Sequence, residues 1–104
     1  MAQSIMQSEK RCYITGRTDN LHKHHIYGGA NRKNSEKYGF WVYLTAEYHN
    51  MSDKGVHFNR GLDLRLKAEC QKRFEQTHTR AEFMRIIGKN YITEERAADN
   101  DLEF

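Results

Sequence analysis

Histidine is concentrated in one part of this chain, and imidazole can both bind a metal ion and take up a proton near neutral pH. Five of the six histidines in the 104 residues fall between positions 22 and 57: His22, His24, His25, His49 and His57. Three such rings are enough for one metal ion, and a fourth remains free as a general base. The cluster predicts metal-assisted hydrolysis; the alternative is surface histidines with one hydrogen-bonded ring in the core.

Short strands are expected to position the first three of these histidines. Aromatic and β-branched residues predict one strand over residues 12–15 and a second from Leu21 to Ile26 or Tyr27, which together form a β-hairpin. The apolar run of residues 40–44 predicts a buried strand. Residues 30–39 between them are polar, end in a glycine, and form a loop or a short helical turn.

Helices are expected to follow the strands. Residues 46–50 fit one helical turn and residues 52–55 a loop. A helix from about Arg60 or Gly61 to Gln76 is predicted by an apolar stripe with a spacing of four: Leu62, Leu66, Cys70 and Phe74. A shorter helix is predicted by a capping box, with Thr79 as N-cap and Glu82 three residues on; it carries Phe83, Ile86 and Ile87 and stops at Gly88.

Length and charge indicate one small domain with a polyanionic partner. We expect a mixed α+β domain over residues 11–92, a flexible polar segment over 1–10 and a disordered acidic tail over 93–104. Residues 1–92 carry sixteen basic against nine acidic side chains, a net charge of +7. Such a body favours nucleic acid as the partner, although a merely solvated charged surface has the same composition.

Cysteine usage and hydropathy bear on the compartment. Cys12 and Cys70 are too few for a disulfide framework and form no C-x-x-C pair, which is typical of a reducing cytosol. No apolar run approaches the roughly 20 residues that cross a bilayer, and the N-terminus lacks the apolar core of a signal peptide. We therefore expect a cytoplasmic protein without a membrane partner.

The motif around the histidines resembles the HNH (His-Asn-His) nucleases, the ββα-metal family. The resemblance rests on features in chain order: Cys12 in the first strand, His24-His25-Ile26, the Gly28-Gly29 break, the apolar strand ending at Leu44, His49, and His57. It covers the chain from Cys12 through about Tyr91 and is nearest to the phage-encoded branch, including recombination-associated members. It implies a ββα-metal core, a DNA endonuclease with one divalent metal ion, and the cytoplasm of a bacterial host.

The resemblance also implies a role for each histidine of the motif. In the family the second histidine of the pair is the general base and the first is a metal ligand. This implies that His25 activates water and that His24 holds the metal. His49 matches the histidine that opens the metal-binding helical segment, and His57 matches the last histidine of the motif, so both are expected as ligands.

The chain departs from the family pattern in three ways. Many members hold a structural zinc in two C-x-x-C pairs, but the matching positions here are Cys12, Thr15, Thr45 and Tyr48, so no structural zinc is expected. The middle asparagine is absent near Phe40 and Trp41, which leaves Asn31, Asn50, Asn59 or no residue to orient the base. The interval from His49 to His57 is long, so Asn50 and Asp53 are alternative third ligands.

Strand geometry bears on which histidines share a site. Adjacent residues of a regular strand point to opposite faces, so His24 and His25 meet in one site only if the strand is bent or bulged. In a straight strand His22 and His24 share a face, which makes His22 a reserve ligand. The two downstream histidines lie eight residues apart, so they straddle a turn or precede a helix that begins later.

Basic residues flank the histidines on both sides in sequence, and we expect them to contact DNA phosphates: Arg32, Lys33, Lys37, Lys54 and Arg60. Three imidazoles suit zinc, nickel or manganese better than magnesium, although coordination geometry can reverse this order. The resemblance suggests a phage or host recombination or packaging protein as a partner and leaves the oligomeric state open. The alternative function is a catalytically inactive DNA- or protein-binding module on the same scaffold.

Overall fold

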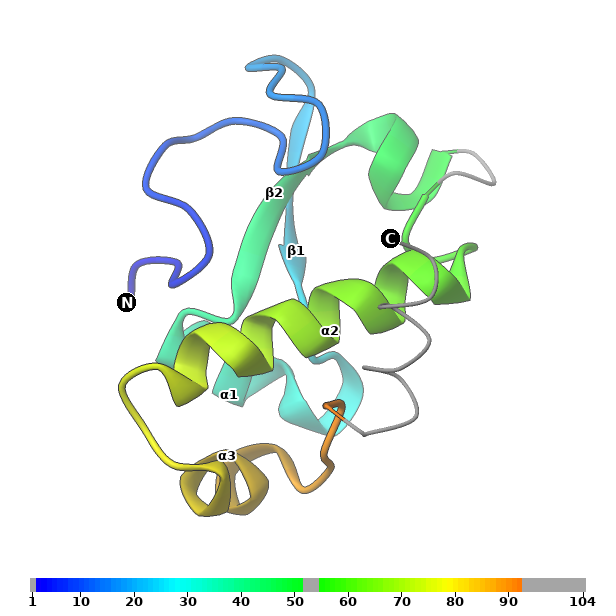
Figure 1. The fold of residues 1–104 in the computed structure, drawn as a ribbon. Coiled ribbons are helices and arrows are strands. Elements are labelled where there is room, and N and C mark those ends of the chain that lie inside the picture. Colours follow the sequence, from blue (N-terminus) through cyan, green and yellow to red (C-terminus); the bar gives the residue numbers. More distant parts are fainter. Residues whose placement is uncertain (1, 52–54, 93–104) are drawn as a thin grey trace, which may run out of the picture.

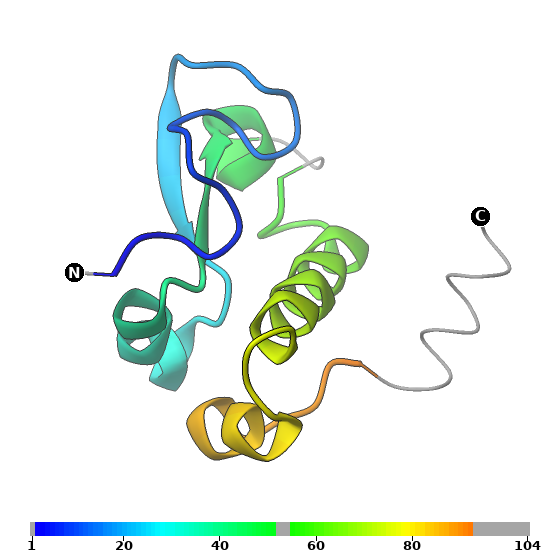
Figure 2. The same ribbon diagram turned by 60° about the vertical axis from the view of Figure 1, so that its left-hand side comes forward.

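A two-stranded antiparallel sheet and three α-helices make up residues 2–51 and 55–92, the part of the chain that the computed structural model describes. The strands are β1 (Leu21–His25) and β2 (Trp41–Thr45), and the helices are α1 (Arg32–Tyr38), α2 (Arg60–Glu75) and α3 (Arg80–Ile87). A 3-10 helix, η1 (Gly29–Asn31), precedes α1, and a π-helix, η2 (Glu47–Met51), follows β2. The views in Figures 1 and 2 show α2 beside the sheet. The expected α+β class is confirmed.

The sheet pairs different segments from those that the sequence predicted. β1 runs antiparallel to β2 in continuous register from Leu21↔Thr45 to His25↔Trp41, and α1 lies between them in sequence. The predicted hairpin between residues 12–15 and the next strand is wrong, because Cys12 makes only an isolated bridge to Tyr43. Residues 12–17 instead form a turn in which Gly16 N–H donates to the Cys12 carbonyl (2.8 Å), so these backbone groups are used locally.

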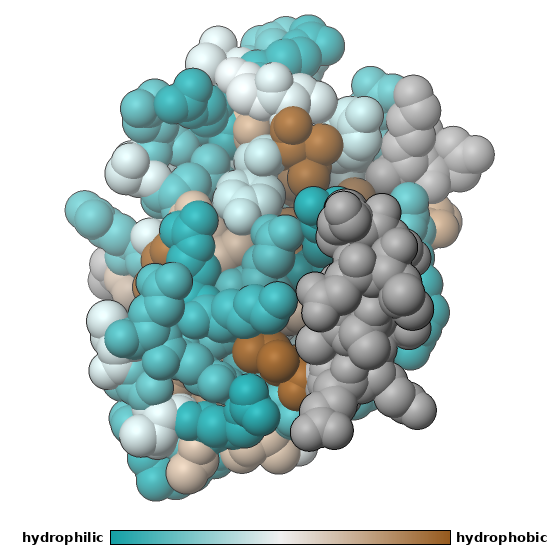
Figure 3. Space-filling view, in the orientation of Figure 1, coloured by the Kyte–Doolittle hydropathy of each residue, from teal (hydrophilic) through white to brown (hydrophobic). Residues whose placement is uncertain are grey.

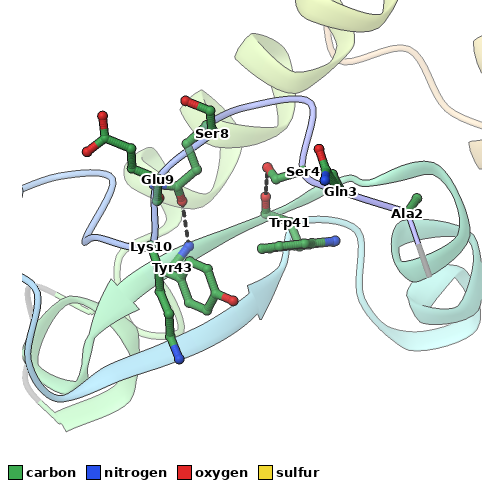
Figure 4. A pocket seen from close by; sticks show the side chains of 9 residues that line it. Ala2, Gln3, Ser4, Ser8, Glu9, Lys10, Trp41 and Tyr43 are labelled. Atoms are coloured by element: carbon green, nitrogen blue, oxygen red, sulfur yellow. Dashed lines mark hydrogen bonds between the residues drawn. The ribbon is translucent and has the colours of Figure 1, made fainter.

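The N-terminal segment covers the edge of β2 that β1 leaves unpaired. Met6 is buried in the core, and Ile5 packs against it. Ser4 Oγ donates to the Trp41 carbonyl (2.5 Å), as Figure 4 shows, and Tyr43 N–H donates to Gln7 Oε1 (2.7 Å). A hollow of about 320 Å³ remains between this segment and the β2 side chains. These contacts protect a strand edge that would otherwise expose its backbone groups.

The core lies between the sheet and the helices. The predicted stripe of α2 is confirmed, with Leu66, Cys70 and Phe74 buried and Leu62 packed at the margin. Burial raises the pKa of the Cys70 thiol to about 12, in keeping with its role as a small apolar residue. Val42 and Leu44 of β2 are fully buried, so one face of the sheet is turned to this core.

Side-chain caps fix the ends of the helices. Asn59 Oδ1 accepts from the N–H of Leu62 (3.0 Å), so α2 begins at Arg60, as expected. The capping box of Thr79 and Glu82 is present at the start of α3, and Gly88 ends that helix in the left-handed region. Residues 30–39, for which a loop or a helical turn was expected, contain η1 and α1.

The surface is mostly polar, as the face in Figure 3 shows. Phe58 has the most exposed large apolar side chain of the described residues, at 67%. No helix in residues 2–51 and 55–92 combines the length and the apolar composition that crossing a membrane requires. The predicted acidic tail, residues 93–104, lies outside the described part of the chain.

Candidate active site

Three histidines from three separate segments meet in a group that can hold a metal ion. His24 comes from β1, His49 from η2, and His57 from the segment just before α2. One ring nitrogen of each lies within 4.8 Å of the corresponding nitrogens of the other two. His49 Nε2 and His57 Nε2 are 3.1 Å apart. The structure therefore brings together the three metal ligands that the sequence predicted.

Backbone hydrogen bonds close the eight-residue interval between the two downstream histidines. Val56 N–H donates to the Tyr48 carbonyl (2.7 Å), and His57 N–H donates to the His49 carbonyl (3.2 Å). Both histidines precede α2, which begins at Arg60. Most of the loop predicted between them, residues 52–54, lies outside the described residues. Asp53, an alternative third ligand, lies outside the described residues, and Asn50, the other, is exposed.

The His24 side chain is buried, and one of its ring nitrogens has no hydrogen-bond partner among the described residues. The side chain of His24 is only 5% exposed, and the atom without a partner in the described part of the chain is Nε2. Burial, followed by the neighbouring His49 and His57, lowers the pKa of His24 to about 3. The ring is thus neutral at neutral pH and offers a lone pair to the group. A buried polar atom without a partner is costly, and a bound cation would satisfy it.

His22 contacts the group from outside. It shares the core-facing side of β1 with His24, as the straight-strand geometry predicted, and its Nδ1 lies 3.0 Å from His49 Nδ1. Burial, followed by His57 and His22, lowers the pKa of His49 to about 4. His49 thus turns Nε2 toward His57 and Nδ1 toward His22. A metal bound to His49 Nε2 would leave the proton of His49 on Nδ1, where it can be donated to His22. His22 is therefore better suited to orient His49 than to bind the metal itself.

His25 lies on the other side of the strand. The register of β1 with β2 is continuous from Leu21 to His25, so the straight-strand alternative holds, and His24 and His25 point to opposite faces. His25 is instead the last residue of β1, and its Nε2 lies 2.7 Å from Glu36 Oε2 of α1. Glu36 also accepts from Lys23 Nζ (2.8 Å). The hydrogen bond from Lys23, followed by the contact with His25, lowers the pKa of Glu36. The Glu36 side chain therefore stays ionised as a carboxylate.

Glu36 is the side chain that contacts the His25 ring, a place for which the sequence offered only asparagines. Asn59 caps α2, and Asn31 donates to the Ile87 carbonyl, so both amides are engaged elsewhere. A carboxylate on Nε2 fixes a proton there and leaves Nδ1 of His25 as the acceptor. One sequence signal pointed to this residue, because Glu36 is the only acid between Asp19 and Glu47.

His24 and His25 line the same cavity, although they point to opposite faces of β1. It has a volume of about 340 Å³ at the end of β1 and is lined by residues of the strand, the glycine break and α2: His24, His25, Ile26, Gly28, Gly29, Val56, His57, Asp63 and Lys67. The general-base candidate, two of the metal-ligand candidates and a partly buried ion pair thus border a single space. The space is large enough for a phosphate group and its neighbouring atoms.

The predicted DNA-binding residues that the structure describes do not line this cavity. Arg32, Lys33 and Lys37 are exposed on α1, Arg60 is exposed at the start of α2, and Lys54 lies outside the described residues. The cation that lines the cavity is Lys67, which the sequence reasoning did not select. The sequence feature that could have singled out Lys67 is its spacing of four residues from Asp63 on a predicted helix. Many surface helices contain such pairs, so this spacing is not specific.

Two of the four positions that match the zinc-binding pairs of the HNH nucleases, Cys12 and Thr45, are in contact. Cys12 Sγ lies 3.4 Å from the Thr45 nitrogen and 4.0 Å from Thr45 Oγ1. Burial raises the pKa of the Cys12 thiol, but hydrogen bonds from Thr15 and Thr45 outweigh it, and the pKa falls below its usual value. Cys12 thus lies among threonine and backbone groups instead of other thiols.

Comparisons with known proteins add no relative to this picture. No protein-family model matches the chain, and searches of curated proteins and of solved structures found no match.

Proposed function

We propose that the chain is a metal-dependent DNA endonuclease of the ββα-metal type, which hydrolyses a phosphodiester bond with His25 as general base. The observation that carries the proposal is the group of His24, His49 and His57, whose nitrogens lie within 4.8 Å of one another beside the cavity that His25 also lines. The order of strand, strand and helix, with a histidine on each side of the strand end, fits the resemblance seen in the sequence.

His24, His49 and His57 would hold one divalent ion. When bound, the ion would supply a Lewis acid that polarises a phosphoryl oxygen and stabilises the leaving oxygen. Neutral imidazoles are ligands for zinc, nickel or manganese more than for magnesium, and the lowered pKa values of His24 and His49 keep those two rings neutral. The donor set therefore favours a transition metal.

His25 moves the proton in this scheme. Its Nε2–H is held by Glu36 at 2.7 Å, which leaves Nδ1 free to accept a proton from the attacking water. The negative charge of Glu36 then stabilises the imidazolium that forms. Exposed cations of α1 and the start of α2, among them Arg32, Lys33, Lys37 and Arg60, would contact the flanking phosphates.

Nicking of supercoiled plasmid tests this proposal. EDTA-treated protein should cut only after manganese, nickel, zinc or magnesium is added, and His25→Ala should lose about 10²- to 10⁴-fold in rate, the usual worth of a general base. His78→Ala is the matched control, because His78 is exposed and stacks on Phe74, away from the group. Cutting by His25→Ala at the wild-type rate would rule out the assigned base. DNA binding without cutting under any ion would favour a catalytically inactive binding module.

A further inference from the structure

A partly buried ion pair on α2 has no role in the proposed cleavage reaction. Lys67 Nζ donates to Asp63 Oδ2 at 2.8 Å, and the side chains are only 19% and 25% exposed. The same helix carries a second pair at this spacing, Arg65 and Glu69, whose side chains are 65% and 35% exposed. The Arg65–Glu69 pair is an ordinary surface contact, whereas the Asp63–Lys67 pair lines the cavity beside the histidines.

The position of Lys67 is fixed relative to the end of β1. The buried Tyr27, two residues after His25, donates its hydroxyl to the Lys67 carbonyl at 2.6 Å. This bond ties one turn of α2 to the chain segment that leaves β1. Lys67 Nζ also lies 5.6 Å from the centre of the Tyr91 ring, a second neighbour that limits its freedom. The ammonium is thus held near the general-base candidate.

The ammonium of Lys67 can bind an anion other than Asp63. It borders the cavity that His25 and two of the metal-ligand candidates also line, and its side chain is only 19% exposed. A phosphodiester carries one negative charge, and it can take over the ammonium that Asp63 holds, because both are oxygen anions of similar hydrogen-bonding capacity.

We propose that Lys67 is the phosphate-binding cation of the cavity, which contacts a non-bridging oxygen of the phosphodiester, and that Asp63 is its competing partner when no phosphate is bound. This inference rests on the proposed function for its substrate, but its test does not depend on cleavage. It also places a phosphate-binding cation on α2, at the cavity that the histidines line and apart from the exposed cations of α1.

The first experiment measures binding in EDTA, where nothing is cut. We compare Lys67→Met with Lys72→Met, the same change at an exposed position of the same helix. Lys67→Met should weaken binding of a short labelled duplex about 10- to 100-fold, the usual effect of losing a hydrogen bond to a charged group, and Lys72→Met should change it less than about threefold. Inorganic phosphate should compete with the duplex in wild type more effectively than in Lys67→Met. Competition by phosphate without any effect of Lys67→Met on DNA would mean an anion site that DNA does not use.

Asp63→Asn separates this role from a structural one. Removing the competing carboxylate should tighten phosphate and DNA binding several-fold, whereas a merely structural ion pair would give lower stability and no gain in affinity. If Lys67→Met fails to fold, the Lys67→Met/Asp63→Asn double variant removes the uncompensated charge and is compared with Asp63→Asn alone.

The outcomes distinguish this inference from the proposed function. Wild type that cuts DNA while Lys67→Met binds and cuts as Lys72→Met does would overturn the inference and leave the nuclease standing. Wild type that cuts nothing while binding depends on Lys67 would overturn the nuclease and support the phosphate site. Loss of affinity together with a 10- to 100-fold fall in kcat/KM in Lys67→Met would support both.

Discussion

Replacement of Glu36 by glutamine is the sharpest perturbation of the proposed general base. The carboxylate accepts from two donors, Lys23 Nζ at 2.8 Å and His25 Nε2 at 2.7 Å. A glutamine of the same shape has one oxygen and one NH2 group. Because NH2 cannot face an ammonium, the oxygen would turn to Lys23 and the NH2 group to His25. The imidazole would then accept at Nε2 and carry its proton on Nδ1, which is the atom proposed to take up a proton from water.

The expected loss follows from these contacts. Loss of the residue that hydrogen-bonds a functional histidine commonly lowers activity about 10- to 100-fold. Loss of a general base lowers the rate about 10²- to 10⁴-fold. A switched tautomer removes most of the base, so we expect Glu36→Gln to lower kcat by about 100-fold or more. KM should change little, because Glu36 is not among the residues that line the cavity.

The assay is nicking of supercoiled plasmid under single-turnover conditions with a saturating metal ion. Lys23→Met is the matched control, since it removes the other partner of Glu36 and leaves the carboxylate on His25. That variant should lose less than about tenfold, well below the effect of the base. A Glu36→Gln protein with wild-type melting temperature, metal content and nicking rate would refute the orienting role of Glu36.

Further predictions concern the metal group and the DNA contacts. His22→Phe keeps an aromatic ring but removes the partner of His49 Nδ1, so metal affinity measured against a competing chelator should fall about 10- to 100-fold. Without metal, the unfolded chain binds more protons than the folded one below about pH 6.5, because the folded pKa of His24 is about 3; stability is therefore lost as pH falls. The urea unfolding free energy should drop by about 2 kcal/mol between about pH 7 and pH 5 from His24 alone, and His24→Gln should drop by less. A triple change of Arg32, Lys33 and Lys37 to Gln should reduce the slope of log affinity against log salt by about three.

Local sequence signals predicted the helices and the ligand histidines well. The capping box of Thr79 and Glu82 and the four-residue stripe of α2 depend only on contacts within a few residues, and both are present. The resemblance to the HNH nucleases picked out His24, His49 and His57 as ligand candidates, and their ring nitrogens lie within 4.8 Å of one another. The structure adds that two backbone bonds bring the segment of His57 onto that of His49.

Features that depend on long-range pairing were harder to predict. Residues 12–15 have strand-like composition, but their backbone groups close a local turn, and β1 pairs with a strand sixteen residues further on. Glu36 reaches His25 only because α1 packs beside the end of β1, a contact that no local pattern specifies. Lys67 looked like one charge of a helical surface, and only the cavity distinguishes it from Arg65.

Titration of metal against nicking rate tests the central claim most directly. Manganese is added in substoichiometric steps to EDTA-treated protein, and the bound metal and the nicking rate are measured on the same samples, beside a His24→Ala variant. The account predicts a rate that rises with occupancy to a plateau at one ion per chain, and neither binding nor nicking in the variant. Metal bound at the same stoichiometry in His24→Ala, or no nicking by wild type at full occupancy with any of the four ions, would contradict it.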